Sequence, residues 1–258
     1  MSDRLPITAA PGPLEEFAGA FDDLLERRSQ RAALRRYLEG LLLPAERNKT
    51  LTALANTEPM VGATEPPAQK LQWFLSESTW DAEAINTRRL ALLMQREQTA
   101  ATAHGVLVID ETGDRKWGHK WGRKTAHVGR QYLGSIGKID NGVVSVSSLW
   151  ANSRRYWPIA FKPYTPAQHF EKGKADPDFR TKPDLALALV KEAQAQHIPF
   201  RAVVADSFYS EHLVFRDGLS QLRVSYVLAL KPSHTWLHPV GEIGSVAEVA
   251  QAERSYAD

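Results

Sequence analysis

Two short apolar runs that each end in an aspartate carry the residue types best suited to chemistry in this chain. Val106–Ile109 precedes Asp110, and Ala202–Ala205 precedes Asp206. Each run is typical of a buried strand that delivers a carboxylate to its C-terminal end. Side by side in one sheet, the two carboxylates would form a site for Mg²⁺, a hard cation that needs few protein oxygen ligands. Such a site is suited to phosphoryl transfer, because divalent ions stabilise the attacking and leaving oxygens.

Each aspartate also has a simpler interpretation. An acid that closes a strand can be a solvent-exposed side chain or the N-cap of the turn that follows. The sequence leaves this alternative open for Asp110 and Asp206, although two such residues in the element order given below favour a metal pair.

A basic and aromatic segment follows Asp110. It runs from Arg115 to Lys124, and no acidic residue lies in it after Asp114. Basic side chains beside a metal site suit a phosphate backbone, because they replace condensed counterions, and tryptophan can stack on an unpaired base. Alternatively, the segment is a solvated hairpin whose tryptophans pack on the sheet edge. The candidate DNA contacts are Arg115, Lys116, Trp117, Lys120, Trp121, Arg123, Lys124, Arg130 and Lys138.

Two weaker signals are set aside. Gly118–Thr125 has the wrong glycine spacing for a phosphate-binding loop, and it lacks the strand before and the helix after. His234 and His238 stand four residues apart, but Pro232 and Pro239 flank them, which favours a loop with surface histidines over a metal site.

The elements that must position these residues fall into two regions. Up to Thr102 the apolar spacing predicts helices, with an N-cap at Ser29, a break at Pro44 and a capping box over Ser78–Asp81. Further helical segments are expected at 14–25, 45–55 and from Pro67. After Thr102 we predict strands at 106–110, 128–133, 143–150, 202–206 and 225–230, helices at 181–196 and 211–222, a loop over 152–182 and a weak element at 246–252.

This element order predicts an α/β fold. Three early strands favour an antiparallel meander, and the alternation of helix and strand that follows favours parallel crossovers. A mixed sheet with flanking helices and with acids at strand ends is the layout of an RNase H-like domain. We therefore predict an all-helical N-terminal domain over residues 1–102 and an RNase H-like domain over residues 103–258.

Composition excludes several classes of protein. The chain has no cysteine, which excludes disulfides and thiolate metal sites. No apolar stretch is long enough to span a bilayer, and the first residues lack a signal-peptide pattern. The net charge of +2 says little about partners, and a cytoplasmic location is the default expectation.

Several segments together resemble the DDE transposases of bacterial insertion sequences. The resemblance extends from Ala32 to Leu230, and its most specific part is Arg130–Lys138. The segments that carry it are 38–47, 71–75, 109–113, 128–138, 181–183, 198–201, the strand that ends at Asp206, and 226–230.

The resemblance implies an RNase H-like catalytic domain with an Asp-Asp-Glu triad that binds Mg²⁺ or Mn²⁺. It also implies that the N-terminal helices over residues 1–102 bind DNA or recognise the transposon ends. Asp110 matches the first acid and Asp206 the second. The implied reaction is hydrolysis and strand transfer at transposon ends, with double-stranded DNA of those ends and of the target as partners. A homodimer and a nucleoid-associated location in a bacterium also follow from the resemblance alone.

The third acid of the triad is not identified. In the family it lies on a helix well beyond the fifth strand, whereas 52 residues follow Asp206 and the match stops near Leu230. Strand alternation should turn Glu111 away from Asp110, and Glu211 follows Asp206 too closely. The later glutamates without the expected helix context are Glu242, Glu248 and Glu253.

Three interpretations follow from this missing acid. The chain is the N-terminal part of a transposase, or it is a short protein that binds DNA without cleaving it. The third is a structural protein with an RNase H-like fold that has also lost DNA contact.

Overall fold

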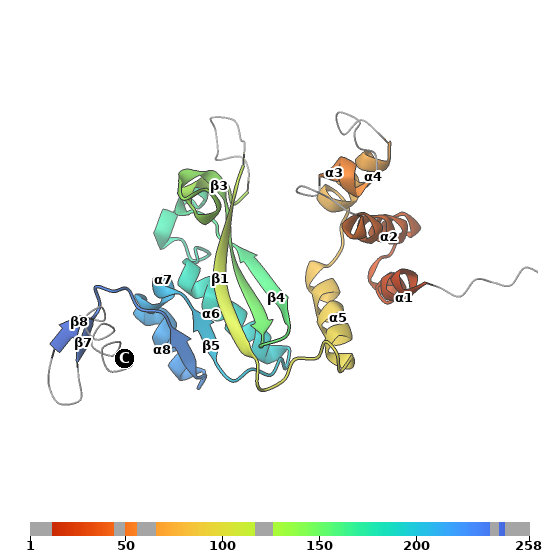
Figure 1. Ribbon diagram of the computed structural model, residues 1–258. Helices are drawn as coiled ribbons and strands as arrows, with labels where there is room; N and C mark the ends of the chain where they lie inside the picture. The colour runs from red at the N-terminus through yellow and green to blue at the C-terminus, as the bar shows by residue number, and fades with distance from the viewer. Residues whose placement is uncertain (1–11, 44–49, 56–65, 117–125, 238–242, 246–258) are drawn as a thin grey trace, which may run out of the picture. The chain divides into compact units, whose positions relative to one another are not determined.

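The computed structural model describes residues 12–43, 50–55, 66–116, 126–237 and 243–245 (Figure 1). The chain divides into two compact units, residues 1–92 and 93–258, which are described separately. The expected domain boundary near residue 102 lies ten residues after this division. Within the described ranges, no helix is both long and apolar enough to cross a membrane.

The first unit is helical. Its elements are α1 (Pro13–Gly19), η1 (Asp22–Leu24), α2 (Arg28–Leu42), α3 (Leu51–Leu54), α4 (Pro66–Ser76) and most of α5 (Ala82–Gln95). Leu54, Ala55, Ala68 and Leu71 form a buried cluster between α3 and α4, against which Tyr37 of α2 packs. Apolar residues at helical spacing therefore pack these short helices together, as the sequence predicted.

Two predicted caps of this unit are wrong. α2 begins one residue after Arg27, whose backbone N–H donates to Gln30 Oε1 at 2.8 Å, so Ser29 is not the N-cap. Asp81 caps α5, because its Oδ1 accepts from two backbone N–H groups of the first turn at 2.9 and 3.0 Å. Ser78 instead accepts from Gln30 Nε2 at 2.9 Å, which a pattern of local spacing cannot reveal.

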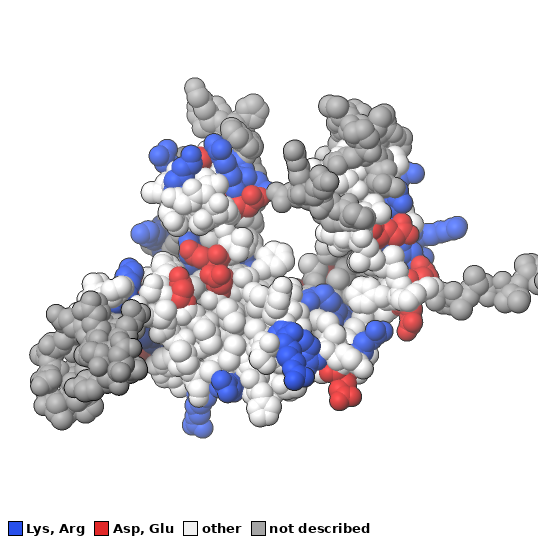
Figure 2. All heavy atoms as spheres, viewed as in Figure 1, with Lys and Arg blue, Asp and Glu red and all other residues white. Residues whose placement is uncertain are grey.

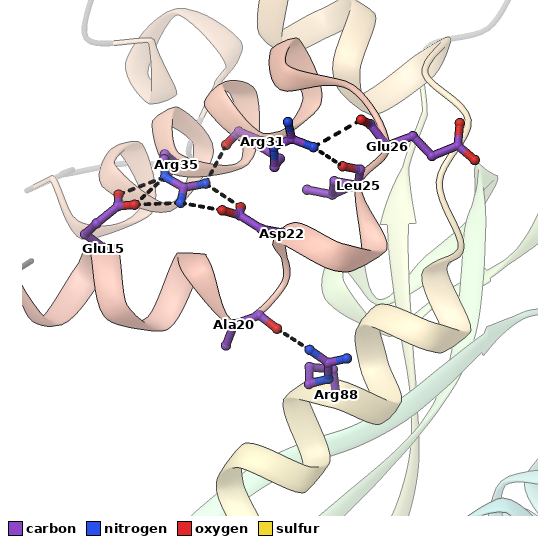
Figure 3. A network of polar contacts seen from close by, with 8 residues as sticks. All are labelled: Glu15, Ala20, Asp22, Leu25, Glu26, Arg31, Arg35 and Arg88. Carbon is purple, nitrogen blue, oxygen red and sulfur yellow. Dashed lines mark hydrogen bonds and ion pairs between the residues drawn. The ribbon is translucent and has the colours of Figure 1, made fainter.

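A guanidinium holds the first three elements of this unit together (Figure 3). Arg35 of α2 donates to Glu15 of α1 at 2.6–2.9 Å and to Asp22 of η1 at 2.8 and 3.1 Å. Hydrogen bonds from Arg35 lower the pKa of both carboxyl groups below their ordinary values. Arg88 of α5 reaches the same region, where it donates to the Ala20 carbonyl and pairs with Asp23 at 2.8 Å.

Arg35→Met is expected to lower the thermal midpoint of the helical unit by a few degrees, because two carboxylates lose their shared partner. Lowered carboxyl pKa values give stability that is present above the unfolded pKa and is lost as the pH falls below about 4. The variant should therefore also lose part of the acid sensitivity of the wild type. Thermal melts between neutral pH and about pH 3 measure both effects. An unchanged midpoint and an unchanged pH profile would show that the network contributes nothing.

The second unit contains one mixed sheet and a separate hairpin. The sheet strands are β1 (Val106–Arg115), β2 (Gly129–Leu133), β3 (Lys138–Ala151), β4 (Tyr156–Pro163), β5 (Val203–Ala205) and β6 (Tyr226–Leu228). The helices are η2 (Gly134–Ile136), η3 (Ala167–His169), η4 (Gly173–Ala175), α6 (Lys182–Ala195), α7 (Ser207–Ser210) and α8 (Leu213–Gln221). β7 (Thr235–Leu237) and β8 (Ile243–Ser245) pair antiparallel as the hairpin, and the weak element predicted at 246–252 lies outside the described residues.

The sheet has RNase H-like topology. β3 pairs antiparallel with β1 and β4, whereas β5 and β6 continue the sheet parallel to β1. α6 connects β4 to β5, and α7 and α8 connect β5 to β6. The predicted α/β fold, with a mixed sheet, flanking helices and a helical N-terminal region, is confirmed.

Two sequence predictions about strands are wrong. The predicted loop over 152–182 contains β4, whose Pro158 and Pro163 are tolerated because β4 pairs only with β3 at an edge of the sheet. β1 does not end at Asp110 but continues to Arg115, because β3 pairs with it as far as Gly142. Asp110 therefore lies within a strand rather than at its end.

One face of the sheet forms the core of this unit. Leu107 and Ile109 of β1 and Trp150 of β3 alternate onto this face and are fully buried or nearly so. α6 packs against β3 and β4 on this side, and it also contacts α8. Asp110 points to the opposite face, because neighbouring side chains in a strand alternate.

Candidate active site

Asp110 lies within β1, and Asp206 follows directly after the adjacent parallel strand β5. Ile109 pairs with Ala205 across β1 and β5, and each aspartate is the next residue along its chain. Neighbouring strands are about 4.8 Å apart, so the backbones that carry the two carboxylates lie close together. Both aspartates are exposed, whereas Ile109 and Ala205 are buried, which places both carboxylates on the face away from the core.

Local hydrogen bonds orient both carboxylates. Asp206 is the N-cap of α7, and its Oδ1 accepts from the Phe208 N–H at 3.0 Å. Asp110 Oδ1 accepts from the N–H of Glu111 at 2.8 Å. The second carboxylate oxygen of each makes no hydrogen bond within the described chain and is accessible to a cation. The N-cap interpretation of Asp206 is therefore correct. Capping uses only Oδ1, so the other carboxylate oxygen can still bind a metal ion.

The donor set suits Mg²⁺ or Mn²⁺. Two accessible carboxylate oxygens are hard ligands, and water can complete an octahedral shell around such ions. Among the residues that the structure describes, no group of three or more His, Asp or Glu side chains is arranged to hold a metal ion. Among the described residues, Asp110 and Asp206 would therefore form a metal site with two carboxylate ligands.

Glu111 lies on the opposite side of the sheet from Asp110, as strand alternation predicts. Its Oε2 is 2.8 Å from Lys182 Nζ at the start of α6, and both side chains are largely buried, with 26% and 16% exposed. Lys182 Nζ also lies over the rings of Tyr164 and Phe208, at 5.8 and 5.5 Å from their centroids. A compensated charge pair thus lies directly behind the aspartate pair.

Tyr209 completes this buried layer. It is fully buried in α7, and its hydroxyl has no hydrogen-bond partner among the described residues. Burial raises the pKa of Tyr209 above its ordinary value, and the charges of Glu111, Asp206 and Asp110 raise it further. The hydroxyl therefore keeps its proton and adds no charge to the site.

Lys182→Met is expected to destabilise the second unit by about 2 kcal/mol, because the aliphatic stem is kept while Glu111 loses its charge partner. Urea unfolding measures this loss. The matched control is Lys182→Met combined with Glu111→Gln, which should recover most of the stability because no unpaired charge is left. A double variant as unstable as the sum of the two single changes would rule out coupling between the two side chains.

The basic segment differs from its prediction. Arg115 Nε pairs with Asp140 at 3.0 Å, and Lys116 Nζ pairs with Asp114 at 2.6 Å. Acidic residues outside the segment therefore balance its first two cations. Asp140 was not recognised as a partner because the register of β3 brings it there. Exposed positions without an ion pair to any described residue are Arg130 and Lys138, whereas Trp117, Lys120, Trp121, Arg123 and Lys124 lie outside the described residues.

Of the two weaker signals set aside from the sequence, the structure describes only His234. His234 lies in a turn, where its Nδ1 accepts from the Lys231 N–H at 3.2 Å. Lys231 also pairs with Glu211 at 2.6 Å, so neither Glu211 nor His234 is arranged as a metal ligand. His238 and the whole of Gly118–Thr125 lie outside the described residues.

Sequence reasoning missed Lys182 and Tyr209 as members of this site. Tyr209 follows Asp206 by three residues, so a short helix after the β5 strand could have revealed it. Lys182 comes from the first turn of α6, and only the folded sheet shows that it reaches Glu111.

This chain is similar to known endonucleases and transposases. The sequence family described as "DDE superfamily endonuclease" matches residues 20–247. The probable transposase for insertion sequence element IS701 of Microchaete diplosiphon is 37% identical over 167 residues, which cover 64% of this chain and 41% of the relative. The chain thus spans about two fifths of the length of this relative.

Two solved structures share a weaker likeness. The Drosophila P element transposase strand transfer complex has a TM-score of 0.28 and 14% identity, and covers 90% of this chain and 40% of its own. The Mos1 mariner paired end complex with Mn has a TM-score of 0.18 and 12% identity, and covers 82% of this chain and 71% of its own. At these scores the fold assignment rests on the strand order rather than on the superpositions.

Proposed function

Because the chain belongs to the DDE superfamily endonuclease family, we propose that it takes part in DNA transposition as a metal-dependent transposase. The single observation that carries this proposal is the placement of Asp110 and Asp206 at neighbouring positions on one face of the sheet. Their accessible oxygens would hold Mg²⁺ or Mn²⁺ beside the bond that is cut.

The proposed chemistry is in-line substitution at phosphorus. Water or a 3′-hydroxyl attacks, a new P–O bond forms, and the P–O bond to the leaving oxygen breaks. A divalent cation, when bound, lowers the pKa of the attacking oxygen and stabilises the charge that develops on the leaving oxygen. The residues of this chain orient the ligands: the Phe208 N–H fixes Asp206, and the Glu111 N–H fixes Asp110.

The buried layer behind the aspartates supports this role. The charge of Glu111 is compensated by Lys182, and the Tyr209 hydroxyl stays neutral, so the negative charge that faces the substrate comes from the two aspartates. The two aspartates therefore attract a cation. The Glu111 carboxylate adds no net negative charge that would repel the DNA phosphate, because Lys182 compensates it. We assign no residue of this chain as the third acid of the triad.

The proposal extends to partners and location. The partners are double-stranded DNA of the transposon ends and of the target, bound in part by the helical unit. A homodimer would bring two ends together. A transposase acts on chromosomal DNA, so the proposed location is the bacterial cytoplasm, in association with the nucleoid.

A second candidate function is a transposase-derived protein that binds DNA without cleaving it. The observation that favours it is that the described residues contain no group of three metal-ligating side chains. With two carboxylates, a second metal ion would be held poorly, which lowers the rate of a reaction that uses two ions. The third interpretation, a structural protein without DNA contact, predicts an affinity for DNA that does not depend on salt.

One assay separates the first two functions. The chain is incubated with DNA that carries the terminal repeats, in the presence of Mg²⁺ or Mn²⁺ or of EDTA. Metal-dependent nicking supports the transposase proposal. Binding of the DNA without any nicking in either metal contradicts it and supports the DNA-binding alternative.

A further inference from the structure

The three strands β1, β2 and β3 extend beyond the aspartate pair as an arm. The arm comprises residues 112–115 of β1, β2, η2 and residues 138–145 of β3. β2 pairs with β3 at Arg130–Asn141 and Tyr132–Ile139, and β1 pairs with β3 from Arg115 back to Asp110. The arm is therefore continuous with the sheet that holds the active site (Figure 1).

One face of the arm is closed. Leu133 is fully buried, and it packs against the backbone of Gly113 and Gly142, where any added Cβ would collide with it or be tightly packed. Arg115 pairs with Asp140 on this face. Leu133, Arg115 and Asp140 on this face therefore already have partners within the arm.

The other face of the arm, here called the outer face, is open and continues from Asp110. Asp110 pairs with Ser147 and Thr112 with Ser145 across β1 and β3. Side chains two residues apart share a face, so the same face continues to Asn141 and Ile139 of β3. Their cross-strand partners on β2 are Arg130 and Tyr132, which complete the outer face.

The exposure of these side chains shows what the outer face offers a ligand. Tyr132 is 56% exposed and Ile139 58% exposed, although both are large apolar residues. Arg130 and Asn141 beside them are exposed as well, and Arg130 forms no ion pair with any residue that the structure describes. Between this end and Asp110 the outer face carries Thr112 and Ser145, and then Asp114 opposite Val143. The Asp114 carboxylate is paired with Lys116 at 2.6 Å, which compensates its charge on this face.

The chemistry of the outer face fits a nucleic acid strand. An unpaired guanidinium binds phosphate, and an exposed tyrosine ring stacks on an unpaired base. Ser147 and Ile139 are about 27 Å apart along β3, a length that several nucleotides of one strand can span. In Figure 2, basic side chains gather at the end of the arm around η2, whereas acidic side chains lie nearer to α7.

We propose that a single DNA strand leaving the aspartate pair runs along the outer face of the arm, where Arg130 binds a phosphate and Tyr132 stacks on a base. The inference rests on the proposed transposase function and names the surface that positions its substrate. It also sorts the candidate cations: Arg130 faces the DNA path, whereas Arg115 is engaged on the closed face.

DNA binding in EDTA tests this inference without any contribution from cleavage. A labelled single strand of about 12 nucleotides and the matching duplex are titrated by fluorescence anisotropy over a range of salt. Tyr132→Ala should weaken single-strand binding about tenfold, and Tyr132→Phe, which keeps the ring, should bind like the wild type. Arg130→Ala should reduce the slope of log affinity against log salt by about 0.7.

Arg115→Ala is the matched control, because it removes the same charge from the closed face. It should leave the salt slope and the affinity close to those of the wild type. Circular dichroism and thermal melts of all four variants show whether each is folded.

The inference is overturned if Arg130→Ala and Tyr132→Ala bind as tightly as the wild type, or if Arg115→Ala is the variant that loses affinity. In either case metal-dependent nicking by the wild type leaves the proposed function intact. A wild-type chain that binds neither probe contradicts both the inference and the proposed function. Self-association that depends on Tyr132, with no DNA binding, would assign the outer face to a second copy of the chain.

Discussion

Asp110→Asn is expected to lower metal-dependent nicking of DNA by at least about 1,000-fold. Asparagine has the shape of aspartate and can still accept the hydrogen bond from the Glu111 N–H, so the local backbone is kept. It lacks the negative charge that a hard divalent cation requires. DNA binding in EDTA should be unchanged or slightly tighter, because a like charge near the phosphates is removed.

Asp206→Asn should give the same loss of nicking, and the loss can be distinguished from damage to α7. Asparagine is as good an N-cap as aspartate, so α7 keeps its cap to the Phe208 N–H. A fall in nicking therefore reports the missing metal ligand rather than a damaged helix. Asp114→Asn is the matched control on β1, because this exposed carboxylate pairs with Lys116. Nicking by Asp110→Asn or Asp206→Asn at the level of the control would contradict the assignment.

Trp150→Ala is expected to lower the free energy of unfolding of the second unit by about 3–5 kcal/mol. Trp150 is fully buried, and its ring stacks on Trp157 with centroids 5.7 Å apart. Its indole N–H donates to the Pro199 carbonyl at 3.0 Å, and the variant leaves that carbonyl without its donor. The change therefore combines a cavity with a lost buried hydrogen bond.

Hydrogen exchange of β1 amides measures this effect, because these amides belong to the second unit alone. Tyr156→Ala is the matched control: Tyr156 is a large aromatic residue of the same sheet that is 78% exposed. It should change the free energy of unfolding by less than about 1 kcal/mol. Equal losses in the two variants would contradict the account of the core.

Local sequence signals predicted the parts of the fold whose causes are local. Thr181 caps α6 by accepting from the Asp184 N–H at 3.3 Å, and Pro183 stands in its first turn. The apolar run before Asp206 forms β5 within one residue of its expected bounds. In both cases the determining residues lie within a few positions of one another.

The misjudged strands depend on partners far away in the chain. Pro158 and Pro163 indicate a loop when β4 is considered alone, and only its edge position beside β3 makes a strand acceptable. Likewise, the apolar run that predicted the first strand ends at Ile109, but pairing with β3 extends β1 through Glu111-Thr112-Gly113-Asp114. Pairing between distant segments overrode local preference in each case.

In the candidate site, too, some features could be predicted from the sequence and others depend on distant partners. Neighbouring positions for Asp110 and Asp206 followed from element order, because parallel strands place equivalent positions side by side. The partners of Arg115 and Glu111 did not follow, because Asp140 and Lys182 reach them only through strand register and helix packing. Which cations remain free for DNA is therefore a property of the fold rather than of the basic segment.

Direct titration of Mn²⁺ by electron paramagnetic resonance tests the central claim, that Asp110 and Asp206 together hold a catalytic cation. The wild-type chain is predicted to bind one Mn²⁺ more tightly than its scattered surface carboxylates do, and Mg²⁺ should displace it. Asp110→Asn combined with Asp206→Asn should lose this binding, whereas Asp114→Asn should keep it. Equal Mn²⁺ binding by the wild type and the double variant would contradict the claim.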